Sequence, residues 1–433
     1  MNMTDDKKCA CGREHTSPAD TVLTGSKVVS KLPEVIKKYD AGKAFVLSDK
    51  NTYKAGGEKV CDILKAGGIE FSSYVLDKDM VEPNEENVGS VIMHYDNSCD
   101  IVIAVGSGVI NDIGKILSSV ADKPYVIVAT APSMDGYASA TSSMTRDGLK
   151  VSIPSKSAEV IIGDTDILCR APEKMLVSGL GDMLAKYVSI CEWRISNLIT
   201  GEYYCEEIAE LVRKALKKCT DNADGLLKRD KIAVEAVFEG LVTCGLAMTY
   251  AGLSRPASGV EHYLSHIWDM RGAEFGTKVD LHGIQCGIGT YIAVKLYDKI
   301  KGIVPDKDKA MGYVSDFDFE KWSEAMRAFL GKGAESMIKL EAKERKYDKI
   351  KHSKRIDVII ENWDKIIEII NEELPSVNDF AAILRKINAP ETLEEIGLTS
   401  DLIPMSFKAS KDIRDKYVLS RLCWDLGILD EII

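Results

Sequence analysis

The segment 100–115, DIVIAVGSGVINDIGK, has the pattern of a buried strand, a tight turn and a helix. Its apolar run ends at Gly106-Ser107-Gly108, and apolar residues recur at helical spacing from Val109 onward. Glycines let a backbone approach a ligand closely, and the N–H groups at a helix N-terminus attract a pyrophosphate. Because Asn111 replaces the third glycine of a G-x-G-x-x-G pattern, a plain strand–helix turn explains the segment as well as a nucleotide loop does.

The same alternation surrounds this segment. Further strands are predicted at 43–49, 72–77, 124–133 and 159–168, with helices at 52–66 and 84–95. Short strands rich in Val and Ile, separated by helices, predict a parallel sheet covered on both faces. Beyond Pro172 the apolar residues have helical spacing only, and the lysine-rich segment 319–372 is expected to be exposed. We therefore expect an N-terminal tail (1–20), a Rossmann-like α/β domain (21–170) and an all-helical domain (171–433).

Composition narrows the class of protein. The 433 residues carry a net charge of −11, which opposes nonspecific binding to nucleic acid. The longest apolar runs stay below the roughly 18 residues of a membrane span, and the N-terminus lacks the apolar region of a secretory signal. Eleven cysteines without a framework spacing indicate reduced thiols. A cytoplasmic protein is expected.

Two further positions are candidates for ligand binding. The stretch 129–141, ATAPSMDGYASAT, follows a predicted strand, and open α/β sheets bind ligands at the carboxyl ends of their strands. Ser133, Asp135 and Ser139 are therefore site candidates, although such residues also form ordinary turns. Asp49 ends the strand FVLSD. It is either a surface turn residue or the partner of an adenosine ribose, where its charge would favour NAD over NADP.

Three of the six histidines lie between residues 259 and 282. His262 and His266 are spaced i, i+4 on one helix face, and His282 follows. A helix pair with a distant third ligand is typical of a metal site, although each histidine could also be an ordinary polar residue. Asp182 is the best further ligand, because an unpaired carboxylate in its apolar context would be costly. Such a site could activate an alcohol or a carbonyl, and beside a nucleotide loop it favours hydride transfer.

Several motifs together carry a resemblance to a known family. They run collinearly over roughly residues 20 to 290, as GSGVINDIGK, TAPSMDGYASATSSM, SIPSKSAEVIIGDTDIL, GLGDMLAKYVSICEW, GEYYC, SRPASGVEHYLSHIWDM and LHG. The chain resembles the dehydroquinate synthase-like, iron-containing alcohol dehydrogenase superfamily, and within it the bacterial sn-glycerol-1-phosphate dehydrogenases. The resemblance implies reversible, NAD(P)H-dependent reduction of dihydroxyacetone phosphate to sn-glycerol 1-phosphate. It also implies a homodimer or larger homo-oligomer.

The resemblance assigns roles to individual residues. One divalent metal, zinc or nickel, would be bound by Asp182, His262 and His282. The substrate would be contacted by Asp135, Asp182 and His266, and His266 is a plausible proton carrier because imidazole titrates near neutrality. The nicotinamide nucleotide would be bound by Asp49, Gly106, Gly108, Val109, Ile110, Asn111, Asp112, Thr130, Ala131, Pro132, Ser133 and Ser139.

Some positions depart from the usual pattern of the family. Related sequences usually carry an aspartate at Glu192 and simpler residues at Gln285 and Cys286. None of these is a ligand position, so the departures concern the substrate rather than the chemistry. Arg255 and Lys278 are candidates for gripping the substrate phosphate, with a structural or solvated role as the alternative.

Other functions remain open at this point. A glycerol dehydrogenase would act on the unphosphorylated alcohol with the same metal ligands. Dehydroquinate synthase shares the fold, but its metal carboxylate resembles a glutamate and this chain offers Asp182. A nucleotide- or metal-binding homologue without activity is a third alternative, which the intact ligand set opposes. The stretch CACGREH, with Cys9, Cys11 and His15, is expected to be a mobile, thiol-bearing tail, with a zinc-type site as the alternative.

Overall fold

The computed structural model describes residues 9–17, 19–146 and 149–433. The chain forms two compact units. Unit 1 comprises Met1–Met183 and Glu210–Leu253, and unit 2 comprises Leu184–Ala209 and Ser254–Ile433. The division falls inside one helix, α9 (Glu206–Asp221), whose first residues are counted with unit 2 and whose remainder belongs to unit 1.

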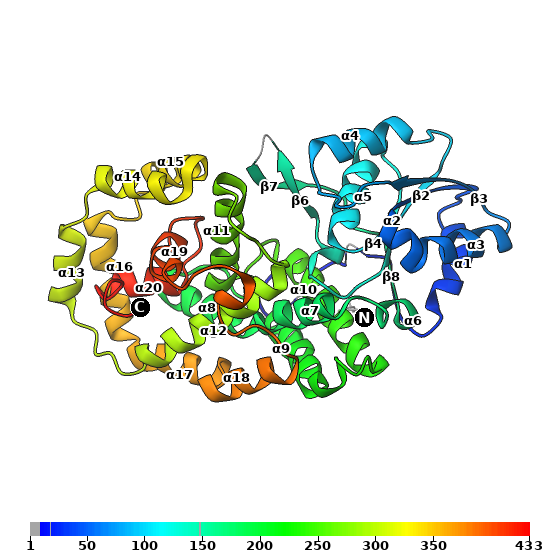
Figure 1. Ribbon diagram of the computed structural model, residues 1–433. Coiled ribbons are helices and arrows are strands. Elements are labelled where there is room, and N and C mark those ends of the chain that lie inside the picture. The colour runs from blue at the N-terminus through cyan, green and yellow to red at the C-terminus, as the bar shows by residue number, and fades with distance from the viewer. Residues whose placement is uncertain (1–8, 18, 147–148) are drawn as a thin grey trace. The chain divides into compact units, whose positions relative to one another are not determined.

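Unit 1 contains a six-stranded sheet in the order β1-β8-β5-β4-β2-β3, with all neighbouring strands parallel (Figure 1). In that order the strands are Thr21–Gly25, Val160–Asp164, Tyr125–Ala129, Ile101–Gly106, Lys43–Asp49 and Glu70–Leu76. The central strands β4, β5 and β8 are buried along their whole length, as strands covered on both faces must be. The predicted parallel α/β sheet is confirmed.

Helices cover both faces of this sheet. On one face, apolar residues of α1 and α3 such as Leu32, Val60 and Leu64 pack against inward-facing residues of the strands such as Val46 and Ile103. On the other face, α5 packs against β2, β4 and β5. The helices of this unit are α1 (Leu32–Lys37), α2 (Lys50–Thr52), α3 (Glu58–Ala66), α4 (Glu85–His94), α5 (Gly108–Ala121), α6 (Thr165–Leu168), α7 (Glu173–Leu184) and α10 (Lys231–Ala251).

Three elements of unit 1 differ from the sequence prediction. Strand β1 was not expected, because its TVLTG sequence has no continuous apolar run. The antiparallel hairpin of β6 (Thr141–Arg146) and β7 (Leu149–Pro154) was also missed, because β6 is mostly Ser and Thr. The helix expected at 52–66 begins at Lys50 and contains a π-helical turn, Tyr53–Gly57, before α3.

Helix α10 is the one helix in the described part of the chain that is long and apolar enough to cross a membrane. However, 72% of its most apolar window is buried inside the structure. Helix α9 is fastened along it, because the Cys219 thiol donates to the Ala236 carbonyl at 3.2 Å and Lys218 pairs with Glu239 at 2.5 Å. The apolarity of α10 is therefore explained by its position in the core of unit 1.

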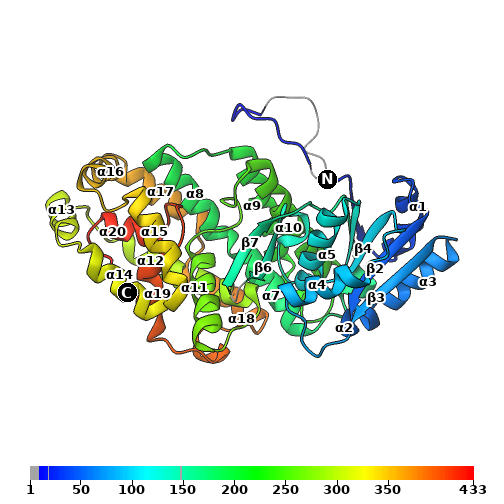
Figure 2. The ribbon, with the colours of Figure 1, turned by 90° about the horizontal axis from the view of Figure 1, so that it is seen from above.

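The regular secondary structure of unit 2 is helical in the residues that the structure describes. Helices α11 and α12 pack against each other (Figure 2). Exposure was expected for segment 319–372, but its helices each bury one face, with Met326, Ile356 and Ile366 among the buried residues. The helices are α8 (Lys186–Thr200), α11 (Val260–Phe275), α12 (His282–Ile300), α13 (Lys307–Ser315), α14 (Phe319–Leu330), α15 (Ala334–Glu344), α16 (Lys349–Glu361), α17 (Trp363–Glu373), α18 (Val377–Lys386), α19 (Leu402–Ser410) and α20 (Leu419–Asp425).

Candidate active-site residues

The two predicted nucleotide loops of unit 1 lie side by side. Strand β4 ends at Gly106 and β5 ends at Ala129, and these two residues are paired in register. The Thr130 amide donates to the Gly106 carbonyl at 3.0 Å, and the Ser107 and Ser133 hydroxyl oxygens are 2.6 Å apart. The turn that opens α5 and the loop after β5 therefore form one surface at the carboxyl end of the sheet.

The two glycines of the turn differ in what a side chain would meet at each position. A Cβ on Gly106 would lie 2.4 Å from the Ile110 Cβ, so the turn itself requires glycine there. A Cβ on Gly108 would meet only the Met134 side chain, at an ordinary 3.4 Å. Gly108 begins α5, where the first backbone N–H groups of a helix have no partner within the helix. The contacts of Gly108 within the chain do not require glycine at this position.

Two predicted nucleotide-binding side chains also have partners within unit 1. The buried Asn111 amide group donates to the Gly136 carbonyl at 3.1 Å, and its oxygen accepts from the Tyr125 hydroxyl at 3.1 Å. Asp49 caps α2, where its Oδ1 accepts two backbone N–H groups at 2.7 and 2.8 Å. The Asn111 side chain is thus part of the scaffold, and only the second carboxylate oxygen of Asp49 lies outside the cap.

A buried lysine, Lys115, was not singled out from the sequence. Its Nζ lies 3.0 Å from Asp112 Oδ1 and donates to Ser139 Oγ at 3.3 Å and to the Thr141 carbonyl at 2.5 Å. Burial raises the pKa of the Asp112 carboxyl, and the Lys115 charge opposes that shift. A lysine on the apolar face of a helix, three residues after an aspartate, was the available signal. Lys115 thus links two predicted site residues, Asp112 and Ser139.

Helix α7 holds the loop after β5 by hydrogen bonds to the main chain. The Ser178 hydroxyl donates to the Ser133 carbonyl at 3.0 Å. One turn later, Oδ2 of the fully buried Asp182 accepts the Asp135 amide at 3.0 Å. The structure thus brings the predicted residues Asp135 and Asp182 together, and it orients the Asp182 carboxylate through one of its oxygens.

Two glycines let helices approach this loop backbone to backbone. A Cβ on Gly179 of α7 would lie 1.8 Å from the Pro132 carbonyl oxygen. A Cβ on Gly245 of α10 would lie 2.8 Å from the Asp135 carbonyl oxygen. Both distances are too short for any residue larger than glycine without movement of the backbone. Neither position could be predicted from the sequence, because nothing local to a helical glycine shows which distant carbonyl it faces.

Unit 2 brings the three predicted histidines together. His262 and His266 lie on α11, and His282 is the first residue of α12. The ring centroid of His282 is 5.0 Å from that of His262 and 5.9 Å from that of His266. His262 is buried, with 5% of its surface exposed, whereas the other two are half-buried.

Neighbouring side chains orient two of these rings. Glu261 Oε1 lies 2.8 Å from Nδ1 of His262, and Ser265 Oγ lies 3.3 Å from Nδ1 of His282. The Ser265 hydroxyl is itself held by the Gln285 amide at 3.0 Å. A histidine that ligates a metal commonly bonds its other ring nitrogen to a carboxylate or another polar group. Both rings therefore have Nε2 as the nitrogen suited to a metal.

Cys286 joins this group, although it was not predicted as a ligand. Its sulfur lies 3.6 Å from His282 Nε2, and the donor atoms of Cys286, His262 and His282 all lie within 4.8 Å of one another. Burial alone raises the pKa of the Cys286 thiol, but the charges of the two histidines and their hydrogen bonds outweigh burial and lower it. Cys286 is one helical turn after His282, so i, i+4 periodicity would have found it.

A buried carboxylate pair stabilises the start of α11. Glu192 Oε2 accepts the Val260 amide at 2.9 Å, and its Oε1 accepts the Leu419 amide at 2.8 Å. Burial, followed by the negative charge of Glu261, raises the pKa of Glu192 to about 8. A Cβ on Gly259 would lie 2.5 Å from Glu192 Oε2 and 2.7 Å from Glu261 Oε2, so glycine is required beside the pair. Glu192 thus positions the segment that carries His262.

Arg255 and Lys278 were considered for the substrate phosphate. The Arg255 guanidinium is buried and donates to both Glu202 oxygens at 2.6 to 2.9 Å, to the Ser196 hydroxyl and to the Tyr417 carbonyl. These bonds engage the guanidinium within unit 2 and give Arg255 a structural role there. Lys278 is exposed.

Known proteins are similar to this chain in sequence. A glycerol-1-phosphate dehydrogenase (NAD(P)+) of Halalkalibacterium halodurans is 32% identical over 294 residues, which is 67% of this chain and 74% of the relative. The chain belongs to the glycerol-1-phosphate dehydrogenase family. A member of this family from Bacillus licheniformis is 26% identical over 97% of this chain and 93% of its own length. The broader family described as iron-containing alcohol dehydrogenase matches residues 23–172.

Solved structures agree in fold. A glycerol dehydrogenase from Schizosaccharomyces pombe superimposes with a TM-score of 0.62 at 19% identity, covering 97% of this chain and 91% of that one. An α/β sheet domain followed by a helical region is thereby confirmed. The expectation that this chain is a metal-dependent, NAD(P)-linked oxidoreductase is also confirmed.

Proposed function

We propose that this chain reversibly reduces dihydroxyacetone phosphate to sn-glycerol 1-phosphate with NADH as the preferred hydride donor. The family relationship supports the reaction. The observation that carries the assignment of the site is the group of three histidines in unit 2, two of them with their Nδ1 atoms engaged by Glu261 and Ser265. Such engagement is typical of metal-ligating imidazoles.

The proposed ligands are of types that bind zinc or nickel. Asp182, His262 and His282 would hold it, because one oxygen of Asp182 is fixed by the Asp135 amide and the two histidines offer Nε2. Bound there, a divalent ion supplies Lewis-acid polarisation of the substrate oxygen. Cys286, within 4.8 Å of the histidine donors, would favour zinc among the candidate metals, because a thiolate is a soft ligand.

The carboxyl end of the sheet in unit 1 would bind the nucleotide. The first backbone N–H groups of α5, from Gly108 onward, would bind a pyrophosphate, with residues 130–133 and Ser139 as further contacts. Asp49 would accept ribose hydroxyl groups through the carboxylate oxygen outside its helix cap. Its negative charge would repel the 2′-phosphate of NADPH, which is the physical reason for the preference for NADH.

His266 would supply the proton for reduction. It lies one turn after His262 and is only half-buried, so it can exchange protons with water. An imidazole titrates near neutral pH and can therefore donate to the substrate oxygen in one direction and accept in the other. Asp135, adjacent to Asp182 through its backbone amide, would contact the substrate hydroxyl.

The test is NADH oxidation by the full chain, stripped of metal and reloaded with Zn²⁺ or Ni²⁺. We expect turnover of dihydroxyacetone phosphate that depends on metal, and little turnover of dihydroxyacetone. A coupled dehydrogenase specific for sn-glycerol 3-phosphate should give no signal with the product. Turnover of the unphosphorylated ketone instead would assign the chain to the glycerol dehydrogenases.

Two variants serve as controls. His262→Ala should abolish turnover and bind one metal ion fewer per chain. His94→Ala, at the exposed C-terminal end of α4, should change neither turnover nor metal content. Absence of turnover in metal-loaded protein that binds NADH would contradict the proposed substrate.

We further propose a cytoplasmic homodimer or larger homo-oligomer, with the nucleotide bound by residues 21–170 and the metal held mainly by residues 171–433. Light scattering of the purified chain tests the assembly.

A further inference from the structure

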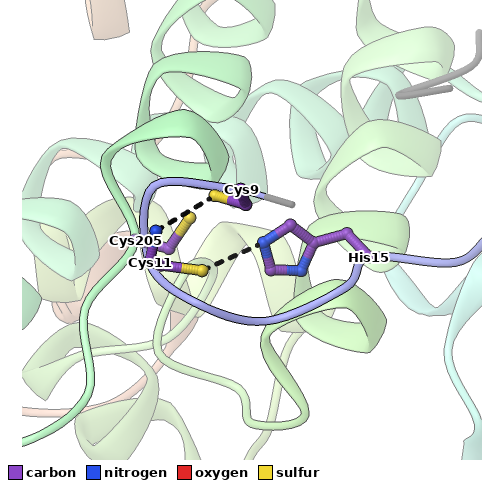
Figure 3. A group of neighbouring side chains, drawn as sticks. All are labelled: Cys9, Cys11, His15 and Cys205. Carbon is purple, nitrogen blue, oxygen red and sulfur yellow. Dashed lines mark hydrogen bonds between the residues drawn. The ribbon is translucent and has the colours of Figure 1, made fainter. Parts of the chain in front are cut away.

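The stretch CACGREH lies outside the site described above, yet its donor residues are turned toward one another (Figure 3). The Cys11 amide donates to the Cys9 sulfur at 3.5 Å, and the Gly12 amide donates to the Cys9 carbonyl at 2.8 Å. Gly12 has a φ of +81°, which favours glycine and closes the turn. An amide that points at a cysteine sulfur stabilises a thiolate, because it places a positive dipole at the charge.

His15 is fixed with one nitrogen toward the cysteines. Its Nδ1 lies 3.1 Å from the Tyr250 carbonyl oxygen, which can only accept a hydrogen bond. Nδ1 therefore carries the ring proton, and Nε2 presents its lone pair to the Cys11 sulfur at 3.3 Å. A backbone carbonyl on the far nitrogen is a common way to orient a histidine ligand. Arg13 adds a second anchor, because its guanidinium donates to the Ala251 carbonyl at 3.1 Å.

The fourth donor, Cys205, comes from the start of α9. Its carbonyl accepts the Ala209 amide at 3.0 Å, so Cys205 is part of the first turn of that helix. Helix α9 continues without a break into unit 1, where its later residues are fastened to α10. The N-terminus of a helix lowers the pKa of a thiol and so favours the thiolate that a metal needs.

The donor atoms of the four residues all lie within 4.8 Å of one another, with Cys9 and Cys205 buried (Figure 3). In a tetrahedral zinc site with Zn–S distances of about 2.3 Å, neighbouring sulfurs are roughly 3.8 Å apart. Small side-chain movements would therefore bring these donors to coordination distance. Three cysteines and one histidine are a donor set of structural zinc sites, in which the protein fills all four positions.

We propose that Cys9, Cys11, His15 and Cys205 bind one structural zinc ion, distinct from the metal of the proposed reaction. The ion joins the N-terminal segment to the start of α9. The segment between Cys9 and His15 is polar apart from Ala10, so it has little apolar surface of its own to hold it in place. Metal coordination supplies the stabilisation that burial does not.

The test measures zinc on the full chain after removal of all metal and titration with Zn²⁺ alone. The double variant Cys11→Ser/His15→Ala should bind one zinc fewer per chain than the wild type. A matched double variant, Cys61→Ser/Cys169→Ser, replaces two half-buried thiols that belong to no such donor group among the described residues, and it should lose none. Equal zinc content in the two double variants would overturn the proposal.

Two measurements leave the four ligands unaltered. Trypsin should cleave after Arg13 in the metal-stripped chain and not in the zinc-loaded chain. With Co²⁺ in a Cys286→Ser background, three thiolates should give an intense sulfur-to-metal charge-transfer band. A chain whose intact mass shows a disulfide at these cysteines, with no band and no zinc-dependent protection, would overturn the proposal.

The outcome is independent of the proposed dehydrogenase activity. His262→Ala should lose turnover and the other metal while it keeps the cobalt band and the protection of Arg13. If the chain lacks activity altogether, the same two readouts still decide whether the cysteine site exists. Cys11→Ser/His15→Ala should retain turnover, because neither residue belongs to the proposed catalytic group.

Discussion

The contact between Gly179 and the loop after β5 allows a prediction with a definite size. In Gly179→Ala the new Cβ starts 1.8 Å from the Pro132 carbonyl oxygen, whereas real Cβ contacts stay above 3.0 Å. Relief requires about 1.2 Å of movement between α7 and the loop. Both partners are main chain, so no side chain can rotate away. Overpacking of this kind costs about 1–3 kcal/mol, from which the better helix propensity of alanine removes about 1 kcal/mol.

The displaced loop carries Ser133 and Asp135. We therefore expect a large loss of kcat/KM together with a modest loss of stability. Misplacement of reacting groups by about 1 Å costs about 100-fold in rate. We expect kcat/KM for dihydroxyacetone phosphate to drop by about that factor, with a lower midpoint of thermal unfolding. Gly89→Ala in α4 is the matched control, because a Cβ there meets nothing within 4 Å. It should stabilise the chain slightly and leave kcat/KM unchanged. If Gly179→Ala behaves like this control in both assays, the backbone contact is absent in solution.

Three further predictions concern charges. Asp49→Asn keeps the cap of α2 and removes the negative charge, so the ratio of kcat/KM for NADPH to that for NADH should rise about tenfold. Glu192 has its folded-state pKa raised from 4.5 to about 8, so the stability it contributes is complete below pH 4.5 and is lost as the pH rises to 8. The unfolding free energy should fall by up to about 1.4 kcal/mol per pH unit in that window, and urea titrations of Glu192→Gln should show a flatter profile. Glu261→Gln should weaken metal binding about 10- to 100-fold in competition with a chromophoric chelator, because the carboxylate on His262 is lost; unchanged affinity would contradict that role.

Local pattern was sufficient for the central strands of the sheet and for the histidines. Strands β4 and β5 are largely runs of Val and Ile. Such short runs are typical of buried parallel strands. The spacing of His262 and His266 put them on one face of a helix, and the structure adds His282 beside them. In each of these cases the informative residues are close in sequence.

The parts that sequence reasoning missed depend on partners far along the chain. Gly179 is informative only once the Pro132 carbonyl is known to face it, and the contacts of Lys115 with Ser139 and Thr141 appear only once the loop after β5 is in place. The polar strand β6 pairs with β7 and gave no apolar signal. Cys286 is the exception, since its distance of one helical turn from His282 was visible in the sequence.

The main-chain grip of α7 on the loop after β5 has a consequence for how this protein can change. Carbonyl and amide groups are present in every residue, so the position of the loop does not depend on which side chains it carries. The side chain of Met134 lies over Gly108 and takes no part in that grip, although its sulfur accepts the Gly136 amide at 3.0 Å within the loop. Substitutions at Met134 could therefore alter the space above the first turn of α5 while the loop stays in place. Such a position lets natural variation or directed evolution explore new cofactors and substrates without first sacrificing the fold.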